Sequence, residues 1–226
     1  MVTCGVPSEL NVLNILILVV LPIFFILLLA FFLFWRFWFA RQPRRIVPPD
    51  ARSIVSPANG KIVVVKKFDV QKSSSTNAKK WNCGSVDILC EDVAPKGWFV
   101  LIMMTPLNVH YQRAPIAGKV VSVAYKKGKF HNAVKNPESL LTLQNEKNEI
   151  TFKGARGKVK IVQIAGVLAR RITASVTKND KVEKGQVVGF INLGSQVAIV
   201  LPENVTLNCK VGDEVIDGET IIAKYA

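Results

Sequence analysis

The sequence predicts a mainly β protein: a barrel-sandwich or hammerhead-like β domain with one transmembrane helix at its N-terminus. Two observations predict this. An uncharged apolar run lies near the N-terminus, and short β-branched runs separated by Gly, Pro and Asn fill the later part of the chain. We expect a membrane anchor over residues 1–40, a basic linker over 41–55 and a β-rich domain over 56–226.

The apolar run extends from Ile15 to Trp35 without a charged residue. At about 1.5 Å per residue it can cross a hydrocarbon core of about 30 Å, so we interpret it as a membrane span. Glu9 is the single charge before it, and four arginines follow it: Arg36, Arg41, Arg44 and Arg45. The positive-inside rule then predicts a single-pass protein of the cell membrane with a cytoplasmic β domain. A shallow re-entrant hairpin bent at Pro22 stays an alternative.

The chain is strongly basic, with 30 Lys and Arg against 16 Asp and Glu and a net charge of +14. An anionic membrane surface suits this charge better than nucleic acid does, because the basic residues are not interleaved with aromatic ones and no reading helix is recognisable. The four cysteines form no C-x-x-C pair. Their spacing predicts neither a metal site nor a disulfide framework, and a reducing compartment is expected.

The β domain contains a weak internal repeat. Residues 181–191, 214–225 and, more loosely, 117–130 each read as Val, polar residues, Gly and then a strand. Gly185 and Gly218 are expected where the backbone needs a positive φ between two strands. Lipoyl carriers are built from such hairpins, but no lysine at a hairpin tip has the neighbours that an acceptor lysine needs, so a lipoyl-like adaptor ranks last among the functions.

The segment 190–202, FINLGSQVAIVLP, places Gly194 and Ser195 between two strands. It resembles the C-terminal signature of the phosphatidylserine decarboxylase family, in which an L-G-S or F-G-S motif is cut to form a pyruvoyl group. The R-A-P that follows the histidine of NVHYQRAP is similar to the short, archaeal-type branch of that family. Further blocks resemble the family in the family's order: 41–63, 104–120, 145–148 and 162–172.

The chemistry of a Gly-Ser bond agrees with this resemblance. A serine hydroxyl can attack the preceding carbonyl, and glycine leaves that carbonyl unshielded. An acyl shift followed by β-elimination would split the chain between Gly194 and Ser195. The resemblance implies that Ser195 becomes a pyruvoyl cofactor and that fragments 1–194 and 195–226 stay associated. It also implies decarboxylation of phosphatidylserine, or of an archaetidylserine-like lipid, to the ethanolamine phospholipid and CO2.

Histidine is scarce, with only His110 and His131 in the chain. His110 matches the family histidine assigned to decarboxylation, where it polarises the carboxylate or returns a proton to the substrate carbon. His131 is expected to be structural or exposed. Arg113, three residues beyond His110, is a candidate to hold the substrate's carboxylate or phosphate through its planar fork. Arg170 and Arg171 form a second candidate pair.

Three positions depart from the family pattern. Asn59 stands where many members carry the Asp of a self-cleavage triad, and Arg113 stands where they carry a second His. Neither side chain can replace a titrating acid–base pair. Asn108 stands where short members often have Asp. These departures favour the alternative of a non-catalytic membrane-anchored β-module that kept the fold and lost processing. The oligomeric state is open, and a homo-oligomer is one alternative.

Overall fold

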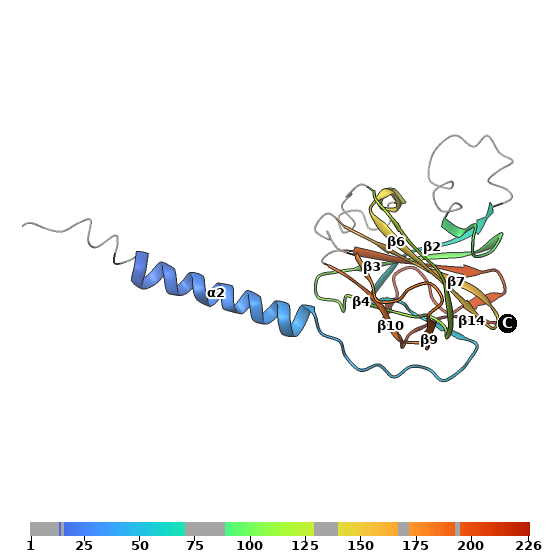
Figure 1. The fold of residues 1–226 in the computed structure, drawn as a ribbon, viewed down its shortest axis with the longest axis horizontal. Coiled ribbons are helices and arrows are strands. Elements are labelled where there is room, and N and C mark those ends of the chain that lie inside the picture. The colour runs from blue at the N-terminus through green and yellow to red at the C-terminus, as the bar shows by residue number, and fades with distance from the viewer. Residues whose placement is uncertain (1–13, 15, 71–88, 129–139, 167–171, 193–194) are drawn as a thin grey trace, which may run out of the picture. The chain divides into compact units, whose positions relative to one another are not determined.

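The computed structural model describes residues 14, 16–70, 89–128, 140–166, 172–192 and 195–226. The chain divides into two compact units, Met1–Arg41 and Gln42–Ala226 (Figure 1). The first unit holds the apolar helix, and the second holds the β strands. This confirms the prediction of a mainly β domain that follows an N-terminal apolar helix.

The helix of the first unit extends over Leu16–Phe39 and is long and apolar enough to cross a membrane. Its regular part is α2 (Leu21–Leu33), and wider turns flank it in η1 (Leu16–Val20) and η2 (Phe34–Phe39). Pro22 lies at the start of α2, beside the wider turns that accommodate its missing N–H. The helix continues past Pro22, so the hairpin considered at this residue is not formed here.

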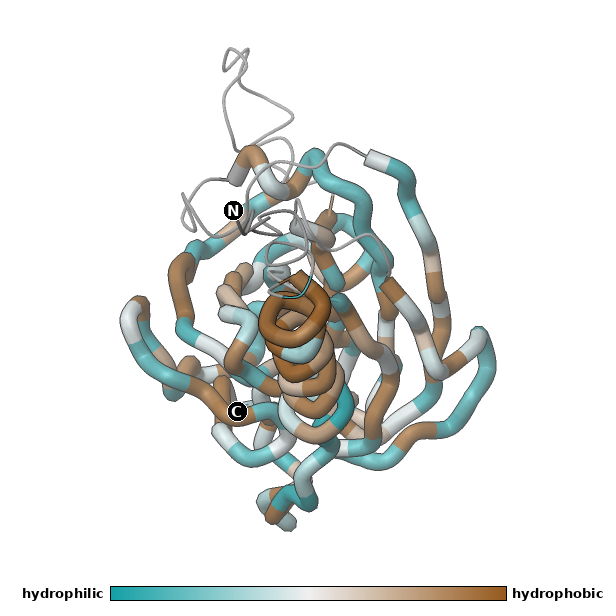
Figure 2. The backbone as a smooth tube through the Cα atoms, turned by 90° about the vertical axis from the view of Figure 1, so that its left-hand side faces the viewer, coloured by the Kyte–Doolittle hydropathy of each residue, from teal (hydrophilic) through white to brown (hydrophobic). Residues whose placement is uncertain are grey.

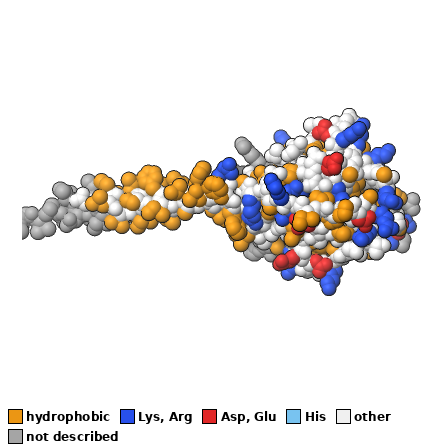
Figure 3. All heavy atoms as spheres, turned by 90° about the horizontal axis from the view of Figure 1, so that it is seen from below, with side chains coloured by type: hydrophobic (Ala, Val, Ile, Leu, Met, Phe, Trp, Pro, Cys, Tyr) orange, Lys and Arg blue, Asp and Glu red, His pale blue; other side chains and the backbone are white. Residues whose placement is uncertain are grey.

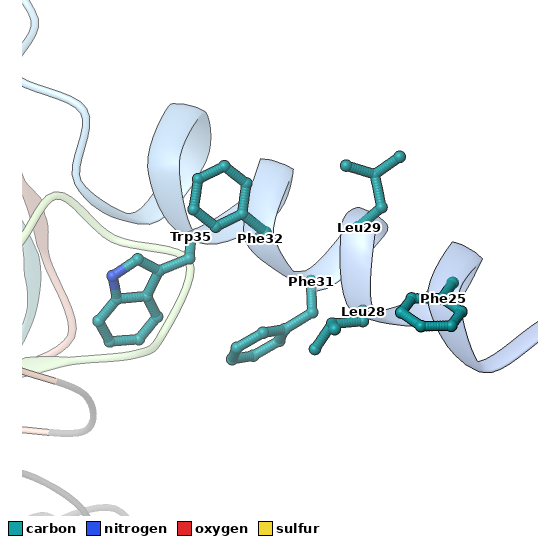
Figure 4. Close-up of a pocket in the computed structure, with 6 residues that line it drawn as sticks. All are labelled: Phe25, Leu28, Leu29, Phe31, Phe32 and Trp35. Carbon is teal, nitrogen blue, oxygen red and sulfur yellow. The ribbon is translucent and has the colours of Figure 1, made fainter.

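All residues of α2 are apolar, as the colouring of its backbone shows (Figure 2), and the face seen in Figure 3 is covered mainly by hydrophobic side chains. Large side chains project from it in different directions (Figure 4), and none within α2 is buried. A surface helix of a soluble protein would show a polar stripe, so this one suits a hydrocarbon environment. At its end, the Arg41 guanidinium lies 4.5 Å from the ring centroid of Trp38. Aromatic and basic residues together are typical of a membrane–water interface.

The second unit consists, over the described residues, of one eight-stranded sheet and two three-stranded sheets, and all paired strands are antiparallel. The large sheet has the order β13-β2-β3-β11-β7-β6-β5-β9, and the small sheets have the orders β1-β14-β12 and β4-β10-β8. The large sheet curls as it crosses the domain (Figure 1).

The bounds of the elements in the large sheet are β2 (Gly60–Asp69), β3 (Lys96–Met104), β5 (Gly118–Lys126), β6 (Lys147–Gly154), β7 (Gly157–Ile164), β9 (Lys181–Val182), β11 (Ser195–Pro202) and β13 (Glu214–Val215). The small sheets contain β1 (Ser53–Val55), β4 (Tyr111–Arg113), β8 (Ile172–Ala174), β10 (Val187–Ile191), β12 (Val205–Leu207) and β14 (Ile221–Tyr225), and a short helix η3 covers Leu140–Gln144.

Strand β11 lies at the centre of the large sheet, between β3 and β7, and all of its residues are buried. Its side chains alternate between two faces. Ile199 and its neighbours on one face join the main hydrophobic core, whereas Ala198 and Val200 join a second cluster on the other face. Burial on both faces explains why the segment reads as a continuous apolar run.

Two turns confirm the predicted glycine positions, because φ is +81° at Gly185 and +76° at Gly218. Both glycines also permit close packing. A Cβ at Gly185 would lie 2.4 Å from Val47 Cγ2, and one at Gly218 would lie 2.9 Å from Arg113 Cδ. The chain entering the domain and the Arg113 side chain therefore pack directly against these turns.

Candidate active site

Ser195 is the first residue of β11 and has no exposed surface. It pairs with Met104, the last residue of β3, so the two side chains share one face of the sheet. The Ser195 hydroxyl lies 3.6 Å from Met104 Sδ, which is a weak acceptor. The serine is thus held at the head of a buried strand without a strong hydrogen-bond partner among the described residues.

His110 lies just before β4 and is fully buried. Its Nδ1 is 2.9 Å from the carbonyl oxygen of Asn108. A carbonyl only accepts, so Nδ1 carries the hydrogen and Nε2 is the nitrogen that gains or loses a proton. The carbonyl of His110 accepts a hydrogen bond from the backbone N–H of Ile191, at 3.2 Å. His110 therefore holds the end of β10, the strand that leads to Ser195.

Met104 and Gln112 connect the surroundings of the serine and the histidine. Gln112 Nε2 donates to the carbonyl of His110 at 2.8 Å and lies 4.0 Å from Met104 Sδ. Met104 Sδ in turn contacts Ser195 Oγ. The structure therefore brings the two predicted catalytic residues, Ser195 and His110, into one buried region.

A chain of hydrogen-bonded side-chain amides ends on the carbonyl of His110. Asn148 Nδ2 donates to Gln163 Oε1 at 2.8 Å, and Gln163 Nε2 donates to Gln112 Oε1 at 2.7 Å. All three amides are buried. Gly189 permits this arrangement, because a Cβ there would lie 2.6 Å from Gln163 Nε2. The amides form a satisfied, uncharged network that fixes the peptide of His110.

Asn59 contacts the histidine loop through Asn108. Asn108 Oδ1 accepts from the backbone N–H of Thr105 at 2.7 Å, which directs Asn108 Nδ2 to Asn59 Oδ1, also at 2.7 Å. Asn59 thus acts as an acceptor, which is the hydrogen-bonding role that an Asp carboxylate could also fill. The amide keeps the acceptor function of the family's Asp and lacks its ability to titrate.

A cavity of about 250 Å³ adjoins this loop. It is lined from β2, β3, the loop before β4 and β13, by Asn59, Gly60, Lys61, Met103, Thr105, Asn108, Glu214, Val215 and Ile216. Polar side chains of both charges reach it, so it can accommodate a zwitterionic group. Among the described residues, no group of three or more His, Cys, Asp or Glu side chains could hold a metal ion.

Arg113 lies in β4 and makes three contacts with the protein. Its Nε donates to Asp217 Oδ2 at 2.8 Å, and its Nη1 donates to the carbonyl of Gly185 at 2.8 Å. Nη2 donates to the carbonyl of Pro43 at 3.0 Å. Arg45 pairs with the other oxygen of Asp217, which is fully buried. These contacts favour a structural role for Arg113. They do not support a role in substrate binding, which stays a prediction.

Gly194, His131 and the pair Arg170 and Arg171 lie outside the described residues. Our interpretations of these four positions stay predictions.

Sequence reasoning missed Gln112, Gln163 and Asp217. Two signals were available. Gln163 interrupts the apolar run of β7, and Gln112 lies two residues after His110, which places both on the same face of a strand. A polar residue inside an apolar strand indicates a buried hydrogen bond. Asp217 precedes a glycine and reads as an ordinary turn residue.

Comparison with known proteins points to one family. A family model described as phosphatidylserine decarboxylase matches residues 31–223. The phosphatidylserine decarboxylase proenzyme of Desulfotalea psychrophila is 38% identical over 187 residues, which cover 82% of this chain and 77% of that protein. A Methanocaldococcus jannaschii protein, provisionally named archaetidylserine decarboxylase proenzyme, is 35% identical over 187 residues, covering 82% of this chain and 87% of its own. The phosphatidylserine decarboxylase proenzyme of Pelodictyon phaeoclathratiforme is 34% identical over 187 residues, covering 83% and 77%.

The β domain has a buried serine at the head of its central strand and a buried histidine in the same region. Together with these matches, this arrangement defines a carboxy-lyase of the proenzyme type. The chain belongs to the phosphatidylserine decarboxylase family. The resemblance found in the sequence is therefore confirmed.

Proposed function

We propose that the chain cleaves itself between Gly194 and Ser195, that Ser195 becomes a pyruvoyl group, and that the processed enzyme decarboxylates phosphatidylserine or an archaetidylserine-like lipid. The observation that carries this proposal is Ser195 itself, buried at the head of β11 with its hydroxyl against Met104. The names of the relatives, decarboxylase proenzymes for phosphatidylserine and archaetidylserine, support both the cleavage and the substrate class.

The atoms of the cleavage come from the peptide, the serine and one water molecule, and a base takes up the Cα proton. Ser195 Oγ attacks the carbonyl carbon of Gly194, the C–N bond breaks, and the amine of Ser195 takes up the hydroxyl proton. β-Elimination removes the Cα proton of residue 195 and releases the carboxylate of Gly194. The resulting dehydroalanine takes up water and loses ammonia, which leaves a ketone at the N-terminus of the fragment 195–226. Among the described residues, the partner of this hydroxyl is a thioether, which is a weak acceptor and competes little with attack on the carbonyl.

The surroundings of Ser195 fit a pyruvoyl group. Ser195 Oγ contacts the thioether of Met104, and the Gln112 amide lies on that same sulfur; neither group reacts with a ketone as a lysine amine would. Residue 195 has no exposed surface in the uncut chain. A pyruvoyl group supplies a ketone that takes up the substrate amine and withdraws the electrons released as CO2 leaves.

We assign the acid–base role to His110. The Asn108 carbonyl fixes the Nδ1 hydrogen, so Nε2 polarises the substrate carboxylate or returns a proton to the substrate carbon. The amide chain through Gln112 and Gln163 holds the ring's own peptide in place. Asn59 holds the loop through Asn108 and has no proton to exchange.

The N-terminal helix fits a membrane anchor for an enzyme that acts on a lipid. Because the arginines follow the helix, we propose that the β domain lies on the cytoplasmic side of the cell membrane. A net charge of +14 favours contact with an anionic leaflet. The substrate then need not leave the bilayer entirely to reach the active site.

Two features favour continued association of the fragments after cleavage. β11, the first strand of fragment 195–226, pairs with β3 on one side and with β7 on the other. Asp217 of the same fragment pairs with Arg45 and Arg113 of fragment 1–194. Separating the pieces would require a central strand to leave the sheet.

The denatured mass of the purified full-length chain tests the proposal, with Ser195→Ala as the matched control. We expect a fragment that starts at residue 195 and carries an N-terminal pyruvoyl group, and an uncut chain in the control. Decarboxylation of phosphatidylserine in mixed micelles should accompany the cut form alone. An uncut wild-type chain in native lipid, or CO2 release by Ser195→Ala equal to that of the wild type, would refute the proposal.

A further inference from the structure

A second cavity, of about 390 Å³, lies outside the active-site region. The turn between β6 and β7, the chain entering β1, the residues before β5, the turn before β10 and the end of β14 form its walls. The lining residues are Pro49, Ala51, Ser53, Ile116, Ala117, Gly154, Ala155, Arg156, Lys184 and Tyr225.

This cavity lies at the opposite end of the strands from Ser195. Gln196, next to Ser195, pairs with Ile164 at the end of β7, and Arg156 precedes the other end of β7. At about 3.3 Å per residue, this length of strand separates the two ends by about 20 Å. A ligand in the cavity therefore does not compete for the position of the reacting serine.

Two cations and one hydroxyl give the cavity its chemistry. Arg156 is exposed at the rim, and no described residue forms an ion pair or hydrogen bond with its guanidinium. Lys184 is fixed in the wall, because its Nζ donates to the carbonyl of Asp50 at 2.7 Å and to Ser53 Oγ at 2.8 Å. The Asp50 carboxylate pairs with Lys224 at 3.5 Å, and its charge also favours the cationic form of Lys184.

The hydroxyl of Tyr225 is buried and has no hydrogen-bond partner among the described residues. The tyrosine as a whole is 5% exposed. Burial raises the pKa of Tyr225 to about 12, although Arg156 acts in the opposite direction. The hydroxyl therefore stays protonated and can donate. A buried polar group without a partner is costly, so a ligand that accepts this hydrogen bond would remove a penalty.

We propose that this cavity binds the phosphate of a phosphate ester. Arg156 offers a planar fork to two phosphate oxygens, and Lys184 and Tyr225 offer donors from other walls. Two cationic side chains and a hydroxyl donor in one lining suit an anion that accepts several hydrogen bonds. The apolar part of the lining, which includes Pro49 and Ile116, suits the carbon attached to the phosphate. The ester is either a soluble molecule or the headgroup of a lipid.

The test uses the full chain with Ser195→Ala in nanodiscs of phosphatidylcholine, titrated calorimetrically with glycerol 3-phosphate. The Ser195→Ala background separates this binding from processing and decarboxylation. We expect saturable binding that Arg156→Gln weakens about tenfold or more, because it loses a charge-assisted pair. The matched control Lys153→Gln removes an equal charge from the same hairpin outside the cavity and should change the dissociation constant less than about twofold.

Tyr225→Phe provides a second, independent check. It should weaken glycerol 3-phosphate binding without lowering the melting temperature of the unliganded protein, because the hydroxyl has no partner to lose. A lower melting temperature with unchanged binding would overturn the proposal. So would the absence of saturable binding, or equal dissociation constants for wild type and Arg156→Gln.

A second arm distinguishes the two sources of phosphate. Phosphatidic acid is added to the nanodiscs, and the glycerol 3-phosphate titration is repeated. If a lipid headgroup enters the cavity, the apparent affinity for glycerol 3-phosphate falls in the wild type and stays unchanged in Arg156→Gln. If the apparent affinity of the wild type is unchanged, the site takes a soluble ester. Either result supports the cavity as a phosphate-ester site once Arg156→Gln has weakened binding.

Discussion

Two of the buried polar networks in the described part of the β domain differ in charge. The network behind His110 is neutral: Asn148, Gln163 and Gln112 form a chain of amides that ends on the histidine peptide. The network at the domain entrance is ionic: Asp217 pairs with Arg45 and Arg113. Most side chains of both networks are buried, so their hydrogen bonds are made to protein groups rather than to bulk water.

The difference shows where a buried charge is tolerated. A buried carboxylate is stable only if it is fully paired, and Asp217 has two guanidinium partners. Near the reacting groups, a fixed charge would shift the pKa of the histidine and compete for the substrate. Amides can position His110 without biasing its protonation. Under the function proposed above, the neutral network would serve the chemistry, and the ionic one the architecture.

The largest effect on activity is expected at His110, where the chain of amides ends. His110→Gln keeps a hydrogen bond to the Asn108 carbonyl but removes the titrating nitrogen, so kcat for decarboxylation should fall by about 10²–10⁴. The measurement is CO2 release from phosphatidylserine by protein that mass spectrometry shows to be cut. Cut His110→Gln protein with the wild-type kcat would assign the proton transfer to another group.

The next effect tests the ionic network. Asp217→Ala leaves two arginines without their shared carboxylate, so the free energy of unfolding should fall by about 3–5 kcal/mol. Urea unfolding of the purified domain in detergent measures it, and Asp217→Asn serves as the milder variant if the alanine protein does not fold.

The control for this prediction is Glu203→Gln. Glu203 pairs with Lys67 at 2.9 Å on the surface, where both side chains are about half exposed. Such a pair contributes at most about 1 kcal/mol. If Asp217→Asn and Glu203→Gln lower the urea concentration at the midpoint of unfolding equally, the buried cluster has no special structural role.

A smaller effect is expected inside the amide chain. Gln163→Leu leaves Asn148 Nδ2 and Gln112 Oε1 buried without their partner, which costs about 1–3 kcal/mol for each group. Because His110 is then less well positioned, kcat should fall while KM changes little. Gln163→Glu should recover activity as pH falls, because a protonated carboxyl can again donate to Gln112. A merely structural role would show no such recovery.

The smallest effect is expected at Asn59. Asn59→Asp keeps the acceptor for Asn108 Nδ2 and adds a carboxylate beside a cavity that already contains Lys61. The free energy of unfolding should change by less than about 1 kcal/mol, and self-cleavage should proceed at least as fast as in the wild type. Time courses of cleavage followed by mass spectrometry measure this. Slower cleavage would mean that the neutral character of position 59 is required.

Much of the fold could be predicted from the sequence. The run QVAIVL predicts a strand, and its lack of alternation follows from burial on both faces of the sheet. The Val-x-x-Gly repeats predicted the turns at Gly185 and Gly218, because a positive φ restricts the residue type. The resemblance predicted Ser195 and His110, which the structure brings into one region.

The networks could not be predicted in the same way. Gln163 and Gln112 are 51 positions apart, and Asp217 is 104 positions from Arg113 and 172 from Arg45. A hydrogen bond between distant residues leaves no periodic signal in a sequence. For this reason Arg113 was interpreted as a substrate ligand, although its contacts lie with Asp217, Gly185 and Pro43.

The central place of β11 has a consequence for the life of the processed protein. Once the bond before Ser195 is cut, the strand between β3 and β7 belongs to a separate polypeptide. Unfolding then separates two molecules, so refolding becomes bimolecular and its yield depends on protein concentration. The uncut Ser195→Ala chain should refold with a yield that does not depend on the association of two fragments. The proposed cleavage would thus convert the folding of one chain into the association of two.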